Sequence, residues 1–252
     1  MSIRVAGLEF AYPKFSLRVE GIAFETAKVT AIVGPNGAGK TTFLKCLGAV
    51  LPIPKGALFI DGRDLAALKS RERARLVCYV PQEHDTTFNY TVSDFVLMGR
   101  AAYISPFALP SHEDAESAAE ALEFVGLSGF ADRAISELSS GERRLVLIAR
   151  ALAQQSAILL MDEPTTFLDP KHETELFRLI RKLAVEKKKT ILVTLHSLEM
   201  AVQHSDLMVF MKRGEVVAYG KSAEVFEDSL LERVYDMQMK IIDWEGRKFV
   251  LR

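Results

Sequence analysis

A glycine-rich segment near the N-terminus carries the clearest chemical pattern. Residues 34–41 fit G-x-x-x-x-G-K-[ST] in full, after a strand-like run at 29–33 and before a helical pattern. Glycines let successive backbone N–H groups turn inward, and the helix start adds positive potential, so the segment can cradle phosphates. Lys40 can reach the β- and γ-phosphates, and the Thr41 hydroxyl can ligate Mg²⁺. The residues predicted to bind a nucleoside triphosphate are Gly34, Pro35, Asn36, Gly37, Ala38, Gly39, Lys40, Thr41 and Thr42.

Two adjacent carboxylates form a second chemical feature. The apolar run 157–161 is typical of a strand buried on both faces, and Asp162 and Glu163 follow it directly. They therefore lie at the carboxyl edge of the predicted sheet, where ligands bind in open α/β sheets. We expect Asp162 to hold Mg²⁺ through a water and Glu163 to act as the general base that polarises an attacking water.

Further motifs precede, separate or follow the glycine-rich segment and the carboxylate pair along the chain. Residues 138–142 read L-S-S-G-E about twenty positions before Asp162, and Gln82 follows a strand-like run. Phe167, Leu168 and Asp169 come after the carboxylates, His196 follows the strand-like run 191–195, and Tyr12 lies about 28 positions before Lys40. Taken together, and over nearly the whole chain, this set resembles the ATP-binding-cassette (ABC) ATPases.

The resemblance implies a role for each residue. Residues 138–142 match the signature motif, whose Ser139 and Gly141 would contact the γ-phosphate held by a second copy in a head-to-tail dimer. Gln82 matches the Q-loop, which contacts Mg²⁺, and His196 matches the switch histidine. Residues 167–169 match the D-loop with Asp169, and Tyr12 matches the aromatic that stacks on adenine. The implied catalytic residues are Lys40, Gln82, Glu163 and His196, and the Mg²⁺ residues are Thr41, Gln82 and Asp162.

Two positions depart from the family pattern. Ser140 stands where the signature motif usually has glycine, so its Cβ would crowd the phosphate or shift its contact. Phe167 stands where the D-loop commonly has alanine. Neither change removes a catalytic group, although both bear on the turnover rate.

Alternating strand and helix patterns must position these residues. Strands are predicted at 3–10, 15–24, 28–33, 57–60, 77–80, 157–161 and 190–195, with a hairpin at 207–219. Capping boxes at Thr91, Ser111 and Ser139 predict three helices in an all-helical insertion, and further helices are expected at 41–50 and 172–186. Residues 222–252 read as a helix and then a hairpin around Glu245 and Gly246.

The fold predicted from this order is α/β: a P-loop NTPase (RecA-like) core with a mostly parallel sheet, an N-terminal antiparallel β subdomain and an inserted α-helical subdomain. We expect a single domain over 1–252, with the core at 1–85 and 156–225, the helical signature subdomain at 86–155 and a C-terminal extension at 226–252.

Composition limits the class of protein. The chain has 32 basic and 33 acidic residues, and its net charge of −1 gives no overall footprint for nucleic acid. Cys46 and Cys78 sit in apolar runs, which suits a reducing cytosol. No run approaches 18 apolar residues, so membrane association is expected to need a partner.

Residues 90–100, with Pro106, Pro110 and 130–133, resemble the ATPase subunits of importers for iron–siderophore complexes, haem and cobalamin. This implies ATP and Mg²⁺ as cofactors, a second copy, a separate membrane permease and an external substrate-binding protein, at the cytoplasmic face of the membrane. The alternatives are an ATPase subunit for another substrate, a soluble non-transport ABC ATPase, a P-loop kinase or GTPase, and an ATP-holding regulatory module. The chain lacks the N-K-x-D motif with which GTPases read guanine. It also lacks the long coiled coil that soluble non-transport ABC ATPases usually insert.

Overall fold

A computed structural model describes residues 1–82, 90–166 and 168–251. Phe167, one of the two departures in sequence, lies outside the described residues. None of the helices in the described part is long and apolar enough to cross a membrane.

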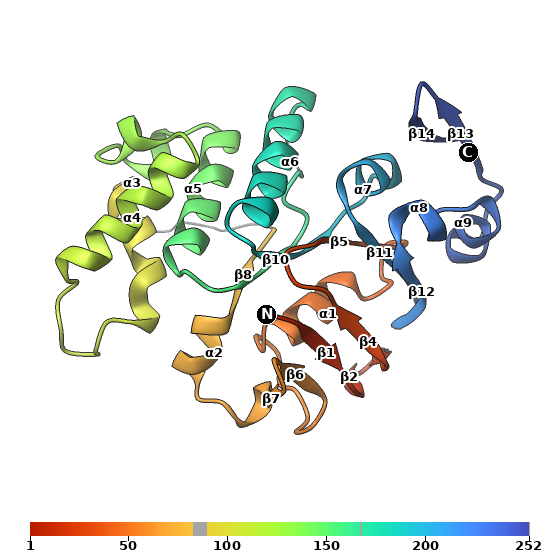
Figure 1. The fold of residues 1–252 in the computed structure, drawn as a ribbon, viewed down its shortest axis with the longest axis horizontal. Helices are drawn as coiled ribbons and strands as arrows, with labels where there is room; N and C mark the ends of the chain where they lie inside the picture. The colour runs from red at the N-terminus through yellow and green to blue at the C-terminus, as the bar shows by residue number, and fades with distance from the viewer. Residues whose placement is uncertain (83–89, 167, 252) are drawn as a thin grey trace.

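A large sheet runs through the centre of the molecule (Figure 1). Its strands, in spatial order, are β2 (Leu8–Tyr12), β3 (Phe15–Val19), β12 (Glu215–Lys221), β11 (Leu207–Lys212), β5 (Val29–Val33), β10 (Thr190–Thr194), β9 (Ile158–Met161) and β8 (Val77–Val80). The five strands from β11 to β8 pair in parallel, whereas β12 pairs with β11 and β2 pairs with β3 in antiparallel fashion. The predicted mostly parallel α/β core is therefore confirmed.

The central strands separate two hydrophobic cores. Alternate residues of β5 point to opposite faces, so Val29 joins the core that holds Leu176 of α6 (Pro170–Val185), while Ile32 joins the core that holds Phe43 of α1 (Lys40–Leu47). Helix α7 (Leu198–His204) covers the same face as α6 through Ala201. Each large apolar side chain buried in this way contributes roughly 1.5–3 kcal/mol.

A small antiparallel sheet packs beneath the large one. It consists of β4 (Ile22–Phe24), β1 (Ile3–Val5), β6 (Leu58–Ile60) and β7 (Arg63–Asp64), in that order. The sequence predicted single strands at 3–10 and 15–24, and this is wrong. The chain leaves the small sheet near Gly7 and returns to it near Gly21, where φ is +71°, so each predicted strand contributes one segment to each sheet.

A helical insertion lies between β8 and β9, on the left of Figure 1. It contains α3 (Val92–Leu97), α4 (His112–Phe124) and α5 (Ser140–Ala153), with the 3₁₀ turns η2 (Met98–Ala102), η3 (Ser128–Phe130) and η4 (Ile135–Glu137). Ser111 and Ser139 form full capping boxes, as predicted. Thr91 accepts from the Asp94 N–H at 3.1 Å, but the Asp94 carboxylate accepts from the Thr91 hydroxyl rather than from its backbone, so this box is incomplete.

The remaining elements were only partly predicted. The sequence assigned no element to the region of η1 (Leu65–Ala67) and α2 (Ser70–Leu76). The single helix expected after residue 222 is two short ones, α8 (Ser222–Val225) and α9 (Asp228–Tyr235). The predicted final hairpin is present as β13 (Lys240–Trp244) and β14 (Arg247–Leu251), because Glu245 and Gly246 take the positive φ values, 52° and 76°, that a two-residue turn requires.

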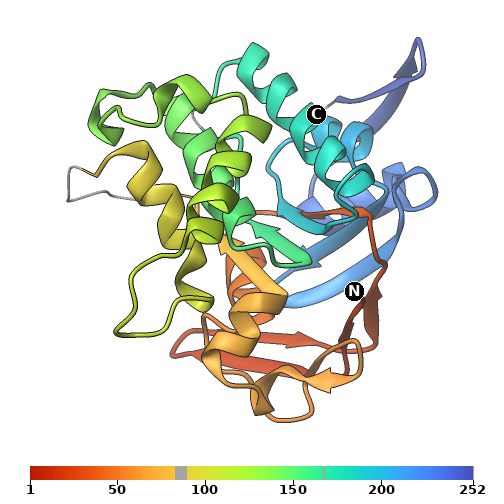
Figure 2. The ribbon, with the colours of Figure 1, turned by 60° about the vertical axis from the view of Figure 1, so that its left-hand side comes forward.

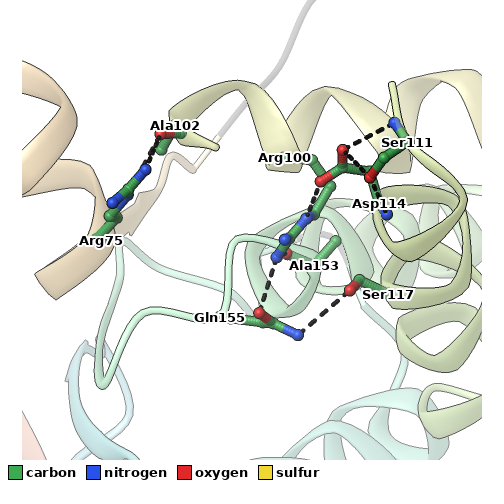
Figure 3. Close-up of polar contacts among 8 residues, drawn as sticks. All are labelled: Arg75, Arg100, Ala102, Ser111, Asp114, Ser117, Ala153 and Gln155. Atoms are coloured by element: carbon green, nitrogen blue, oxygen red, sulfur yellow. Dashed lines mark hydrogen bonds and ion pairs between the residues drawn. The ribbon is translucent and has the colours of Figure 1, made fainter. Parts of the chain in front are cut away.

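The helical insertion lies on the left of Figure 2, and a buried ion pair within it, drawn in Figure 3, holds its parts together. Arg100 Nε donates to Asp114 Oδ1 at 2.9 Å, and the two side chains are 3% and 9% exposed. Arg100 Nη1 also donates to the Ala153 carbonyl and to Gln155 Oε1, while Asp114 Oδ2 accepts from Ser111. Arg100 therefore joins the start of α4 to the end of α5, far apart in sequence.

We expect Arg100→Ala to lower the free energy of unfolding by about 3 kcal/mol, because it leaves the buried Asp114 carboxylate without its cation. Urea unfolding measures this. Ser111 and Arg100 hold the pKa of Asp114 below its ordinary value of 3.8. The stabilisation from this group is therefore present at neutral pH and lost as the pH falls below that value.

The matched control is Arg75→Ala. Arg75 is exposed, unlike Arg100, and donates to the carbonyl of Ala102 in η2, the segment that also contains Arg100. The control substitution should cost under about 1 kcal/mol. Equal losses from the two variants would contradict the importance given to the Arg100–Asp114 pair.

Candidate functional site

The glycine-rich loop links β5 to α1, and crowding explains its glycines. Gly34 and Gly39 have φ values of 154° and 98°. A Cβ on Gly34 would lie 2.1 Å from the Met211 carbonyl oxygen, and one on Gly39 would lie 2.5 Å from Phe15 Cζ. At Gly34 a Cβ would overlap the backbone, and at Gly39 the φ of 98° disfavours any residue with a side chain. The backbone between them curls into the concave shape predicted for a phosphate cradle.

Lys40 lies inside this loop and is only 6% exposed. Its Nζ donates to the carbonyl oxygens of Gly34 at 2.8 Å and Pro35 at 3.3 Å. Burial lowers the pKa of Lys40, and the nearby carboxylates of Glu163 and Asp162 partly offset that shift. The side chain is thus held at the centre of the loop by neutral oxygens that can give way to charged ones.

A cleft of about 360 Å³ opens over the loop. It collects residues from three distant parts of the chain, and its lining is Tyr12, Phe15, Asn36, Gly37, Ala38, Gly39, Lys40, Thr41, Thr42 and Glu163. Tyr12 is 47% exposed and its ring meets Phe10 edge to face at 4.9 Å, so one face remains open. Phe15 was not assigned to the site from sequence, although its place in an aromatic cluster beside Tyr12 was a signal.

Asp162, buried at the end of β9, gathers hydroxyl groups from three other elements. Its Oδ1 accepts from Thr41 Oγ1 at 3.0 Å and from Thr194 Oγ1 at 2.7 Å, and its Oδ2 accepts from the Tyr79 hydroxyl at 2.9 Å. Burial, reinforced by the Asp162 charge, raises the pKa of Tyr79, so it stays a neutral donor. The sequence analysis did not assign Thr194 or Tyr79 to the site. Both are polar residues at or near the end of an apolar strand, and this pattern could have indicated them.

Glu163 occupies a strained position beside Asp162. Its φ is 44°, in the left-handed region that costs a non-glycine residue of order 1 kcal/mol. Its N–H donates to Thr194 Oγ1 at 2.8 Å. Its carboxylate accepts from Gln82 Nε2 at 2.6 Å and lies 2.6 Å from His196 Nε2. The structure therefore brings together three residues that the sequence places 81 and 33 positions apart.

Three residues from the sequence prediction lie elsewhere. Ser139, Gly141 and Asp169 are not among the described residues that line the cleft. Ser139 is the exposed N-cap of α5, and Asp169 caps α6 by accepting from the His172 N–H at 3.0 Å. Gly141 lies close to His172 as well, since a Cβ on it would be 3.5 Å from that ring. The starts of α5 and α6 therefore form a second polar surface on the same chain.

The site has the parts needed to bind a phosphate chain and a divalent cation. Thr41 Oγ1 and Asp162 Oδ1, 3.0 Å apart, are oxygen donors of the kind Mg²⁺ prefers. The described residues contain no group of three His, Cys, Asp or Glu side chains suited to a metal. Mg²⁺ binds one or two protein groups together with phosphates and water, so Thr41 and Asp162 would be enough protein ligands for it.

Comparison with known proteins gives a consistent result. The ABC transporter family profile matches residues 20–166. A probable iron chelatin transport ATP-binding protein of Helicobacter pylori is 34% identical over 254 residues, covering 100% of this chain and 99% of the relative. The ferric enterobactin transport ATP-binding protein FepC of Escherichia coli is 34% identical, over 96% of this chain and 89% of its own.

Solved structures agree with these sequence relatives. A metal-chelate type ABC transporter in an inward-facing conformation aligns with a TM-score of 0.85 and 26% identity, over 99% of this chain and 95% of its own. The cassette MJ0796, solved with ADP and inorganic phosphate, aligns with a TM-score of 0.73 and 26% identity, over 88% and 99%. The loop, the carboxylate pair and these full-length matches lead to one conclusion: the chain belongs to the ABC transporter family, as an ATP-binding and ATP-hydrolysing subunit.

Proposed function

We propose that this ATPase powers uptake of an iron complex, a siderophore or haem, or of cobalamin, through a separate membrane permease. The observation that carries the proposal is the full-length similarity to iron-chelate and ferric enterobactin subunits, combined with a loop and cleft built for a triphosphate. The proposed assembly includes an external substrate-binding protein and places the chain at the cytoplasmic face of the membrane.

The first step is exchange at the phosphate loop. Lys40 would give up the carbonyls of Gly34 and Pro35 for the β- and γ-phosphate oxygens, replacing neutral acceptors with charged ones. The N–H groups of the loop and the start of α1 add donors. Tyr12 stacks on the adenine from the rim of the cleft, where part of its ring is exposed.

Mg²⁺ would be held by Thr41 and Asp162, with Gln82 as a further contact. Bound there, the ion supplies charge neutralisation at the β- and γ-phosphates. Gln82 directs its amide nitrogen to Glu163, and its amide oxygen would be the atom that contacts the ion. Thr194 and Tyr79 orient the Asp162 carboxylate by donating to its Oδ1 and Oδ2.

Glu163 is the proposed general base. Its carboxylate lines the cleft that holds Lys40, and it can accept a proton from water as that water attacks the γ-phosphorus. The bond from the γ-phosphorus to the oxygen of the β-phosphate breaks in the same step, and ADP is the leaving group. In this structure Glu163 Oε2 accepts from Gln82 and its Oε1 lies 2.6 Å from His196 Nε2, and the remaining lone pairs of both oxygens can accept from water. His196 stabilises the charge that builds on the γ-phosphate.

A second copy completes the site. Ser139 and Gly141 would meet the γ-phosphate held by the partner's loop, with Asp169 near the same interface. The Ser139 hydroxyl accepts from the Glu142 N–H and hydrogen-bonds the Glu142 carboxylate, so it would exchange that carboxylate for a phosphate oxygen. Ser140 is exposed at this helix start, so its side chain lies on the surface that the partner would cover.

The proposed division of the chain follows from these roles. Residues 1–85 and 156–225 bind and hydrolyse ATP, and 86–155 presents the signature motif and faces the permease. Residues 226–252 form an extension that carries the final hairpin.

Replacing Glu163 tests the hydrolytic role. Glu163→Gln should keep ATP binding and lower the hydrolysis rate roughly 10²–10⁴-fold, because an amide cannot take a proton at neutral pH. Phosphate release and ATP titration measure the two properties. Glu186→Gln, which replaces the exposed residue that follows the last turn of α6, is the control and should hydrolyse ATP normally. A near wild-type rate in Glu163→Gln would refute the assignment.

Removing one hydroxyl tests the proposed Mg²⁺ residues. Tyr79→Phe should raise the Mg²⁺ concentration needed for half-maximal ATP binding about tenfold, because Asp162 loses one of the groups that orient it. Tyr219→Phe is the matched control, since that hydroxyl donates to the Ala23 carbonyl away from the cleft. An unchanged Mg²⁺ dependence in Tyr79→Phe would count against Asp162 as the metal residue.

The transport role is tested by isolating the partner. The tagged chain, purified from its own cells in mild detergent, should bring down an integral membrane permease, and its loss should reduce uptake of radiolabelled ferric siderophore, haem or cobalamin. A permease whose loss affects a different solute would leave the ATPase assignment intact and overturn the proposed cargo. Recovery of a soluble partner or nucleic acid instead would overturn the transport role.

A further inference from the structure

A buried arginine of α5 contacts the segment that carries Gln82. Arg144 is 7% exposed, and its guanidinium points from α5 to the end of β8. Its Nη1 donates to the Pro81 carbonyl at 3.0 Å and its Nη2 donates to the Gln82 carbonyl at 2.5 Å. The roles proposed above do not use this residue.

The guanidinium is suited to this task. Its N–H groups form a planar fork, so two adjacent nitrogens can hold two successive carbonyls at a fixed angle and separation. Both bonds involve a charged donor, which makes them about twice as strong as neutral ones. The end of β8 is held from its other side too, because the Val80 carbonyl accepts from the Asp162 N–H at 2.9 Å.

These contacts form a continuous path to the hydrolytic carboxylate. Arg144 fixes the Gln82 backbone, and the Gln82 amide donates to Glu163 Oε2 at 2.6 Å. Arg144 lies five positions after Ser139 on the same helix, whose N-terminus carries the signature motif. A rigid helix therefore joins the motif that would meet the partner's ATP to the residue that contacts Glu163 in this chain.

We propose that Arg144 is a positioning residue, which holds Gln82 against Glu163 and makes the position of α5 a determinant of hydrolysis. The inference rests on the proposed role of Glu163. Displacement of α5 would carry the Gln82 backbone with it and change the contact with the carboxylate. Arg144 is not among the described residues that line the cleft around Lys40, so its loss should leave ATP affinity close to that of the unsubstituted chain.

The test separates kcat from KM in the purified full-length chain. Arg144→Ala should lower kcat about tenfold to a hundredfold, since misplacement of a group by about 1 Å has effects of this size, and leave KM and ATP affinity unchanged. Arg144→Lys keeps the charge but not the fork, and should fold normally with an intermediate kcat. Full kcat in Arg144→Lys and Arg144→Ala would overturn the inference, as would a rise in KM without loss of kcat.

Two further variants distinguish positioning from general damage. If Arg144 acts through Gln82, the double variant Arg144→Ala with Gln82→Ala should be no slower than Gln82→Ala alone. Multiplying effects would overturn the inference. Arg150→Ala is the matched control, because Arg150 lies on the same helix over the Phe95 ring at 4.7 Å and should affect stability rather than kcat. An equal kcat loss in Arg150→Ala would show a general loosening of α5 and overturn the inference.

The outcome also separates this inference from the proposed function. A Gln82→Ala variant with full kcat would overturn the role of Arg144, whereas the assignment of Glu163 would still stand on Glu163→Gln.

Discussion

The site depends on satisfying one buried negative charge. Asp162 is 2% exposed at the end of β9, and a carboxylate so placed costs several kcal/mol unless donors surround it. Its donors come from α1, β8 and β10, so the start of α1 and the ends of β8 and β10 must lie close together at one edge of the sheet. The arrangement places Thr41 at the mouth of the phosphate loop and fixes the backbone from which Glu163 projects. The positions of the phosphate loop and of Glu163 thus follow from this one requirement.

In this structure the reactive groups are satisfied by the protein itself. Lys40 bonds to carbonyls of its own loop, and Glu163 contacts Gln82 and His196. Hydrogen bonds exchanged for others contribute little net free energy. The free energy of triphosphate binding therefore comes mainly from placing the negative phosphates against the Lys40 cation and the start of α1. The hydrogen bonds that the protein gives up are replaced by similar ones. The strained φ of Glu163 shows that its position is imposed by its surroundings, with Thr194 holding its N–H.

Two arginines define how the helical insertion is held. Arg100 joins the start of α4 to the end of α5, and Arg144 joins the first turns of α5 to the end of β8. One contact lies within the insertion and the other connects it to the core. Both use a guanidinium to satisfy backbone carbonyls that the ends of α5 and β8 leave open. An insertion fixed in this way can pass a displacement of α5 to Gln82 without a change in the core sheet.

The sequence by itself determined the features that depend on neighbouring residues. The loop at 34–41, the helix starts at Ser111 and Ser139, the buried strand before Asp162 and the turn at Glu245 follow from glycine conformations, capping side chains and apolar runs that act over a few positions. Only the tertiary structure decided which strands share a sheet, which is why the predicted strand 3–10 divides between two. It also decided that Thr194 and Tyr79 meet Asp162 and that Arg144 reaches Gln82. The physical reason is that these contacts depend on the order of strands and the packing of α5 against β8, which no local pattern specifies.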